Sequence, residues 1–130
     1  MILTTKARYA VMAVIEISEE KNSQPISLQT ISEKQKISLS YLEQIFACLK
    51  KDGIVASVKG PGGGYVLGKK REEITVADII KAIGEHVKMT RCSTKEGCVK
   101  VSSKCKTHHL WRGLENKIYE YLDSVPLSSL

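Results

Sequence analysis

The sequence predicts a mainly α-helical fold with one small β-hairpin and a long amphipathic helix near its C-terminal end. Apolar residues recur at helical spacing in four segments before residue 85. Two β-prone runs flank the glycine-rich stretch 60–64, and a final apolar stripe of helical period covers residues 110–125. With 130 residues, these elements suffice for one compact domain with a mainly aliphatic core.

The charge is basic and unevenly distributed. The chain carries 20 Lys and Arg against 14 Asp and Glu, a net charge of +6, and residues 34–71 alone hold a surplus of that size. A basic surface favours an anionic partner such as nucleic acid. Because no apolar run approaches the ~20 residues that span a bilayer and no signal peptide begins the chain, we expect a cytoplasmic protein without membrane contact.

The first half of the chain predicts a helix-turn-helix. Thr4 or Thr5 can cap a first helix, and Ser27 can cap a short second one. After a tight turn at residues 36–37, either Ser38 or Ser40 can cap a third helix that ends at residues 52–53. The expected buried face of this third helix consists of Leu39, Leu42, Ile45, Phe46 and Leu49.

The hairpin that follows makes the predicted fold a winged helix-turn-helix with a C-terminal dimerisation helix. A fourth helix begins at Thr75 and Asp78 and ends at Gly84. We therefore expect a DNA-binding region at 1–84, a ligand loop at 85–108, a dimerisation helix at 109–125 and a tail at 126–130, all in one domain. The glycines at 60–64 lack the Gly-Lys-Ser/Thr of a nucleotide-binding loop, so they favour close approach of the wing to DNA.

The basic helix and wing predict contacts with double-stranded DNA. Serines at a helix start can donate to phosphates or base edges, Glu43 or Gln44 can read bases, and Lys59 can enter a minor groove. Lysines along 50–71 and Arg71 can bind phosphates. The alternative is a solvated charged face with serines that only cap. The candidate DNA-binding residues are Ser38, Ser40, Tyr41, Glu43, Gln44, Lys50, Lys51, Lys59, Gly60, Gly62 and Gly63.

A cysteine-rich segment predicts a metal site. Its spacing is Cys92-x5-Cys98-x6-Cys105-x2-His108, and His109 competes with His108 as a ligand. Three thiolates and an imidazole suit zinc or an iron–sulfur cluster. The wide gaps between these residues favour a loop that surrounds a larger metal group over a structural zinc site. Cys48 lies among apolar residues of the third helix and is expected to be a small buried hydrophobe.

These motifs carry a resemblance. The segments are LT at 3–4, RYAV at 8–11, ISLSYLEQ at 37–44, GPGGGY at 60–65 and CKTHHLW at 105–111. They resemble the iron–sulfur regulators of the Rrf-type family of bacterial winged-helix repressors, over essentially the whole chain. The resemblance implies a homodimer that binds an operator, represses iron–sulfur cluster assembly genes and receives its cluster from assembly proteins. It also implies a [2Fe-2S] cluster held by Cys92, Cys98, Cys105 and His108.

The sequence departs from this pattern at two places. The gap between Cys98 and Cys105 is one residue longer than is usual in the family, which affects the conformation of the loop more than the identity of the ligands. Lys59 stands where an arginine is expected, and the more strongly hydrated lysine suits a narrow minor groove less well. Wing readout is therefore expected to be weaker.

Two other functions compete with this interpretation. One is the same DNA-binding fold with a structural zinc or a nitric-oxide-sensing cluster. The other is a small electron or cluster carrier, which needs no basic helix and wing, so the charge surplus at 34–71 counts against it. We do not expect an enzyme, because the candidate ligands are assigned to the metal site and no acid/base pair is evident.

Overall fold

The structure is a computed structural model that describes residues 3–90 and 105–130. Its elements, in chain order, are α1 (Thr5–Ser18), η1 (Lys21–Ser23), α2 (Leu28–Gln35), α3 (Leu39–Lys51), β1 (Val55–Val58), β2 (Gly64–Leu67), α4 (Val76–Ala82), α5 (His108–Asp123) and η3 (Leu127–Ser129). The expected fold class is confirmed: the described part is a helical domain with one antiparallel hairpin.

The helix starts follow local capping chemistry. Thr4, Ser27 and Ser38 each accept a backbone N–H of the first turn of α1, α2 and α3, respectively. Thr75 and Asp78 form a reciprocal capping box at the start of α4. Each cap satisfies a donor that has no partner inside its helix, so these short helices begin where the sequence predicts.

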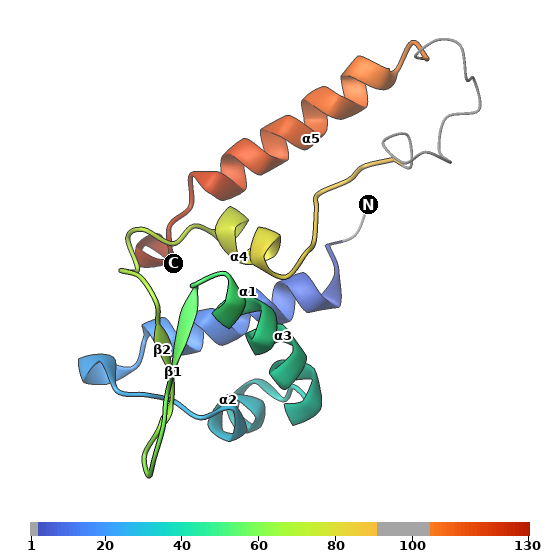
Figure 1. The fold of residues 1–130 in the computed structure, drawn as a ribbon. Helices are drawn as coiled ribbons and strands as arrows, with labels where there is room; N and C mark the ends of the chain where they lie inside the picture. The colour runs from blue at the N-terminus through green and yellow to red at the C-terminus, as the bar shows by residue number, and fades with distance from the viewer. Residues whose placement is uncertain (1–2, 91–104) are drawn as a thin grey trace.

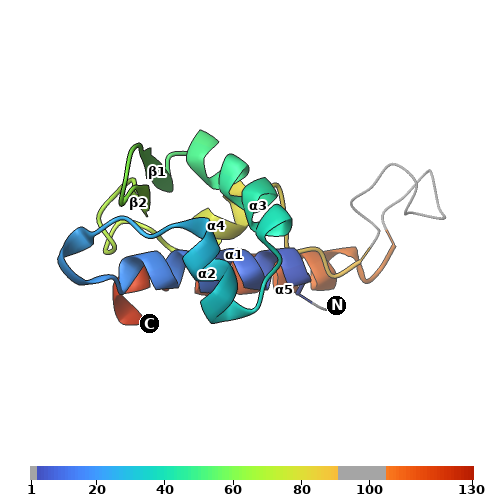
Figure 2. The same ribbon diagram turned by 90° about the horizontal axis from the view of Figure 1, so that it is seen from below.

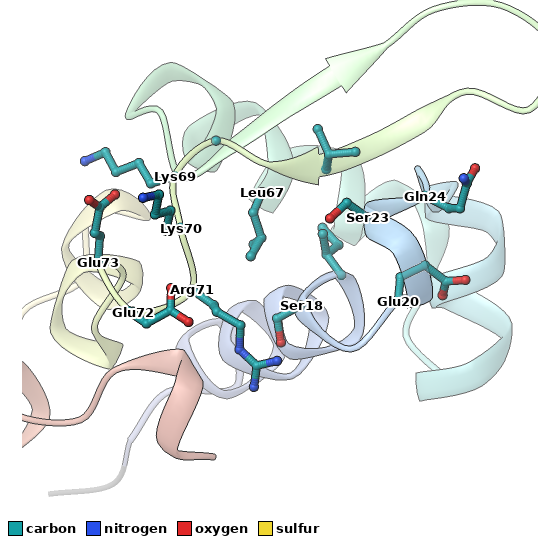
Figure 3. A pocket seen from close by; sticks show the side chains of 13 residues that line it. Ser18, Glu20, Ser23, Gln24, Leu67, Lys69, Lys70, Arg71, Glu72 and Glu73 are labelled. Carbon is teal, nitrogen blue, oxygen red and sulfur yellow. The ribbon is translucent and has the colours of Figure 1, made fainter.

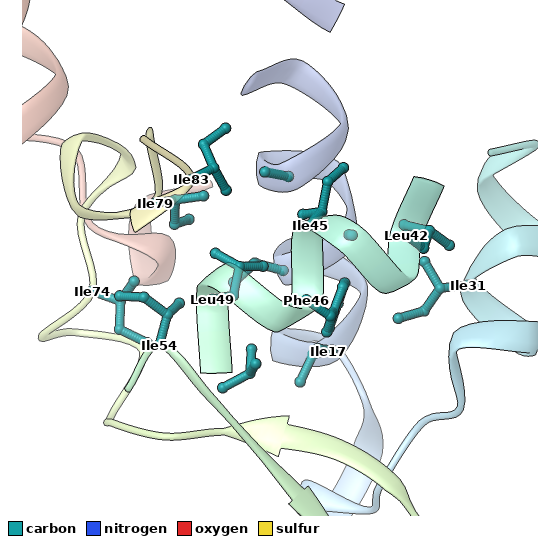
Figure 4. Packing of buried hydrophobic residues seen from close by; sticks show 14 of the residues in the cluster. Ile17, Ile31, Leu42, Ile45, Phe46, Leu49, Ile54, Ile74, Ile79 and Ile83 are labelled. Atoms are coloured by element: carbon teal, nitrogen blue, oxygen red, sulfur yellow. The ribbon is translucent and has the colours of Figure 1, made fainter. Parts of the chain in front are cut away.

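The hydrophobic core lies where α1, α2, α3 and α4 meet the base of the hairpin (Figure 4). Phe46, the only phenylalanine of the chain, is fully buried, and its ring meets the edge of the Tyr65 ring at a centroid distance of 4.8 Å. Around it the core is aliphatic, with Leu42, Ile45 and Leu49 supplied by one face of α3. This burial fixes which face of α3 is left for solvent.

The C-terminal residues 126–130, expected as a tail, pack back onto the winged domain. Leu127 is 1% exposed, and its N–H donates to the Ile74 carbonyl at 2.9 Å. Thr75 and Pro126 form a bridge, and the Val76 N–H donates to the Val125 carbonyl at 3.0 Å. One buried leucine with backbone pairing thus anchors the end of α5 beside α4.

Helix α5 lies along one side of the molecule and extends past α4 (Figure 1). None of its residues is buried, although Leu122 packs against the core near its end. In Figures 1 and 2 the start of α5 and the hairpin tip lie at opposite ends of the molecule. No helix in residues 3–90 or 105–130 is long and apolar enough to cross a membrane.

Candidate nucleic-acid interface and metal ligands

The start of α3 presents polar side chains to solvent. Ser38 caps the helix, with its Oγ accepting the Tyr41 N–H at 3.3 Å, and its own hydroxyl hydrogen is left to donate elsewhere. Ser40, Glu43 and Gln44 are exposed in the first two turns, opposite the buried face of α3. Glu43 and Gln44 follow Ser40 by about one helical turn, so the three residues share one exposed side of α3, as a helix that reads a major groove requires.

Leu39 differs from its expected role, and Tyr41 has a packing contact that the sequence does not predict. Leu39 is expected on the buried face but is 36% exposed, since it is the first residue of the helix and is not among the residues packed against the core. Tyr41 is half-buried, and its ring meets Tyr9 of α1 edge-on at 5.8 Å. Packing of Tyr41 against α1 therefore accompanies any contact it makes with DNA.

Lys50 and Lys51 lie in the last turn of the same helix and are exposed. They follow Ser38 by 12 and 13 residues, so at ~1.5 Å rise per residue they lie about 18 Å from it along the helix axis. The structure does not bring them together with the serines. Contacts made by these lysines would thus fall on a different part of a DNA duplex from contacts made by the start of α3.

The wing presents its tip on the same side as α2 and the start of α3 (Figure 1). Lys59, Gly60 and Gly62 are exposed, and the Gly63 N–H donates to the Gly60 carbonyl at 2.9 Å to close the turn. Gly60 and Gly62 adopt φ values of +97° and +74°, which residues with a side chain rarely adopt. A Cβ on Gly63 would overlap the Val58 carbonyl.

The wing is attached to the helix-turn-helix by its backbone. Ile26, just before α2, pairs with Tyr65 of β2 as an isolated antiparallel bridge. Sequence periodicity does not predict this pairing, because Ile26 is a single residue between Pro25 and the Ser27 cap. The bridge positions the hairpin relative to α2 and α3.

Lysines 69 and 70 and Arg71 line a groove of about 770 Å³ at the base of the wing, between the end of α1 and the stretch 68–73 (Figure 3). Both lysines are exposed. Arg71 is half-buried, its side chain lies beside Ser18, and its buried Nε has no hydrogen-bond partner among the described residues. Of the three, Arg71 is the least available to a phosphate.

The described part of the metal segment is its last turn. Cys92 and Cys98 lie outside the described residues, whereas Cys105 and His108 lie at the start of α5. The His108 N–H donates to the Cys105 carbonyl at 3.1 Å, and the Cys105 Sγ lies 3.3 Å from the Thr107 Oγ1. The backbone of one turn thus connects the two candidate ligands.

The two neighbouring histidines differ in setting. His108 is the first residue of α5 and is half-buried, whereas His109 is exposed, and their rings are edge-on at 5.4 Å. His108 is therefore part of the helix and not of the expected loop. In residues 3–90 and 105–130 no three His, Cys, Asp or Glu side chains gather at a metal site, so the four-ligand set remains a prediction.

Cys48 is half-buried and packs against the core through α3. This agrees with its expected role as a small apolar residue. Cys48 lies in α3 and Cys105 lies just before α5, so the two cysteines belong to different elements.

The fold and the exposed face of α3 define a class of protein: winged-helix DNA-binding proteins. The model of the Rrf2 family, described as iron-dependent transcriptional regulator, matches residues 3–130. The chain belongs to the Rrf2 family of transcription regulators. Its relatives are regulators and not enzymes.

Relatives and solved structures agree with this assignment. The chain is 49% identical, over all of its 130 residues and 79% of the relative, to the HTH-type transcriptional regulator IscR of Pectobacterium carotovorum. It is 50% identical, with the same coverage, to IscR of Photorhabdus laumondii. The structure of T. potens IscR superposes with a TM-score of 0.80 at 34% identity, covering 99% of this chain and 85% of that one.

A further similar structure is CymR, the global cysteine regulator of B. subtilis. It superposes with a TM-score of 0.82 at 30% identity and covers 99% of this chain and 95% of CymR. The same architecture thus occurs in regulators with different physiological assignments. The protein is a DNA-binding transcription regulator of the IscR/Rrf2 type.

Proposed function

We propose that this regulator senses iron–sulfur status through a [2Fe-2S] cluster held by Cys92, Cys98, Cys105 and His108. The observation that carries the proposal is the backbone hydrogen bond from the His108 N–H to the Cys105 carbonyl, which holds these two candidate ligands in one turn at the start of α5. Soft thiolates with one imidazole are a donor set that iron–sulfur clusters accept. The fraction of the protein that holds a cluster would depend on the supply of iron and sulfide.

DNA binding is proposed to use the exposed stripe of α3 and the wing. Ser38, Ser40, Glu43 and Gln44 would contact base edges and nearby phosphates in a major groove, with Tyr41 beside them. The wing residues Lys59, Gly60, Gly62 and Gly63 would approach the neighbouring minor groove. Lys50 and Lys51 would bind phosphates farther along the duplex, about 18 Å away along the helix.

A homodimer is proposed to form through α5. Leu110, Leu114 and Tyr121 are 60%, 38% and 68% exposed on this helix, although they lie at the helical spacing of a buried stripe. A second copy that pairs α5 with α5 would cover them and place two α3 helices in one assembly. Two such helices read half-sites about one helical turn, ~34 Å, apart.

The regulatory step is proposed to act through this dimer. His108 is the first residue of α5, so its ligation constrains the same helix that joins the two copies. A cluster shifts the distribution of dimer geometries only by its differential affinity for them. The loaded form would repress cluster-assembly genes, and proteins of the assembly system would deliver the cluster. Because the partner is chromosomal DNA, the function belongs to the cytoplasm.

The experiment compares operator binding by cluster-loaded protein and by the Cys92→Ala/Cys98→Ala/Cys105→Ala variant. The DNA would be the promoters of iron–sulfur assembly genes, with a scrambled duplex of equal length as the control. Loaded protein is expected to bind the promoter at least tenfold more tightly than the variant. Equal affinity of both proteins for every promoter would contradict cluster sensing.

Zinc is the second candidate for the site. The close Cys105-x2-His108 spacing is one that zinc ligands also use. A structural zinc would stabilise the start of α5 without reporting on sulfide supply. Treatment with nitric oxide separates the two candidates, since an iron–sulfur cluster would bleach whereas a zinc site would show no visible change.

A further inference from the structure

A hydrogen bond to a side chain of α5 attaches the segment that leads from α4 toward the metal ligands. After α4, the Glu85 N–H donates to the Ile80 carbonyl at 3.2 Å, and residues 86–90 then cross toward the end of the molecule where α5 begins (Figure 1). The Met89 N–H donates to the Glu115 Oε1 at 2.7 Å. Both residues are half-buried, so this hydrogen bond is partly shielded from water.

The crossing segment, residues 85–90, is loosely packed on both sides. A cavity of about 180 Å³ lies on one side, lined by Ile80 of α4, by residues 85–87 and by Tyr119 and Leu122 of α5. A second cavity of about 130 Å³ lies between the same segment and the start of α1. Because side-chain packing leaves these spaces, the Met89–Glu115 hydrogen bond is one of the contacts that hold the segment against α5.

Glu115 is well placed to connect this segment with the ligand His108. The two residues lie seven positions apart on α5, which is about two turns and places them on similar faces. Met89 precedes Cys92 by three residues in the sequence. The Glu115 carboxylate of α5 therefore binds the chain that enters the ligand loop, while the chain that leaves the loop continues into α5.

We propose that Glu115 is a positioning residue that clamps the entrance of the ligand loop to α5. A carboxylate that accepts a backbone N–H forms a charge-assisted hydrogen bond, stronger than a neutral one. With the clamp closed, less freedom is lost when the ligands gather around a metal group. Coupling is reciprocal, so metal binding also tightens the clamp. The coupling between the clamp and metal binding rests on the proposed cluster function, whereas the clamp itself does not.

The test uses three variants of the full chain. Glu115→Ala removes the acceptor, and Glu115→Gln keeps an oxygen that can accept the Met89 N–H. Glu120→Ala is the matched control, because it removes an exposed carboxylate from the same helix. Hydrogen exchange of residues 85–90 is measured first, on metal-free protein. Exchange in Glu115→Ala is expected to be at least about tenfold faster, and near wild type in the other two variants.

The second measurement follows the metal group. Each protein is reconstituted anaerobically with ferrous iron and sulfide, and loss of visible absorption is timed in the presence of a ferrous chelator. Glu115→Ala is expected to lose its colour several-fold faster than wild type, with rescue by Glu115→Gln. A general loss of stability would appear in the thermal unfolding of the winged domain, which Glu115→Ala is expected to leave unchanged.

The outcomes separate this inference from the proposed function. Unchanged exchange of residues 85–90 in Glu115→Ala overturns the clamp. Faster exchange with an unchanged rate of colour loss overturns the positioning role. If wild-type protein takes up no iron and sulfide, the proposed cluster function fails and so does positioning toward it, and the exchange measurement still decides whether the clamp exists.

Discussion

Ile26 and Tyr65 exchange both of their backbone hydrogen bonds, at 3.0 Å and 2.8 Å. This bridge joins the chain just before α2 to the outer side of the wing. Because both N–H groups are satisfied by the partner residue, the hairpin and the helix-turn-helix are expected to move as one body. The relative placement of wing and α3 is thus built into the monomer and does not depend on DNA.

Substitution of Gly64 tests this connection. A Cβ on Gly64 would overlap the backbone carbonyl of Ile26, which the bridge prevents from moving aside. We expect Gly64→Ala to lower the free energy of unfolding by about 1–3 kcal/mol and to weaken DNA binding by displacing the wing. Urea unfolding and binding to an operator duplex check the two effects.

Gly53→Ala serves as the control for this prediction. Gly53 follows the end of α3 with a φ of +78°, and a Cβ there would meet no atom within 4 Å. Backbone strain should lower the free energy of unfolding of this variant by ~1 kcal/mol. The wing should stay in place, and DNA affinity should be retained. Equal loss of DNA affinity in both variants would show that the Ile26–Tyr65 bridge does not set the wing position.

The proposed DNA interface predicts two kinds of mutational effect. Removal of a phosphate contact by Lys51→Ala should reduce the slope of log affinity against log salt by ~0.9 on any sequence. Lys117→Ala, an exposed lysine of α5, should leave the slope unchanged. Fluorescence anisotropy over a range of salt concentrations measures both. A slope near zero for wild-type protein would refute an electrostatic interface.

Gln44 is expected to act on specificity instead of on the salt slope. Its side chain is exposed in the second turn of α3, where an amide can bind adenine through two hydrogen bonds. Gln44→Ala should lower discrimination at one base pair by ~1–3 kcal/mol. Binding to a set of operators with single base changes identifies the position. A uniform loss across all sequences would show that Gln44 contacts the backbone only.

The proposed dimer predicts that a charge on the exposed stripe of α5 separates the two copies. Leu114→Glu would place an unpaired carboxylate in an apolar contact, which costs several kcal/mol, so the dimer should dissociate at least 100-fold more readily. Asn116→Glu adds the same charge at an exposed position of the helix and should leave the dimer intact. Sedimentation at micromolar concentration decides. Monomeric wild-type protein would contradict the proposal.

The choice between the two histidines is open to a direct test. His108 is half-buried and its N–H donates to the Cys105 carbonyl, whereas His109 is exposed. His109→Ala should leave the visible spectrum almost unchanged, while His108→Cys should retain the cluster at a lower reduction potential, since histidine ligation raises the potential. Bleaching by His109→Ala but not by His108→Ala would reverse the assignment.

Local signals account for what the sequence predicts well. Ser27, Ser38 and the Thr75–Asp78 pair act within one helical turn, so their side-chain chemistry determines the helix starts without help from distant residues. The helix-turn-helix and hairpin follow from such signals in order along the chain. Ser40, Glu43 and Gln44 likewise lie on the exposed face that the apolar period of α3 leaves, whereas Tyr41 is half-buried.

Long-range contacts account for what the sequence does not predict. The Ile26–Tyr65 bridge uses only backbone atoms, and residues 126–130 lack a periodic pattern although Leu127 is buried. The Met89–Glu115 hydrogen bond joins residues 26 positions apart. Each depends on how whole elements pack, which no window of sequence contains.

The most direct test of the central claim is analysis of iron and acid-labile sulfide, with an absorption spectrum, on protein purified without oxygen. The account predicts a brown protein with iron and sulfide in equal amounts, about two of each per chain, and loss of both in Cys105→Ala. Colourless protein with one zinc per chain would contradict a [2Fe-2S] sensor and establish a structural zinc site in its place.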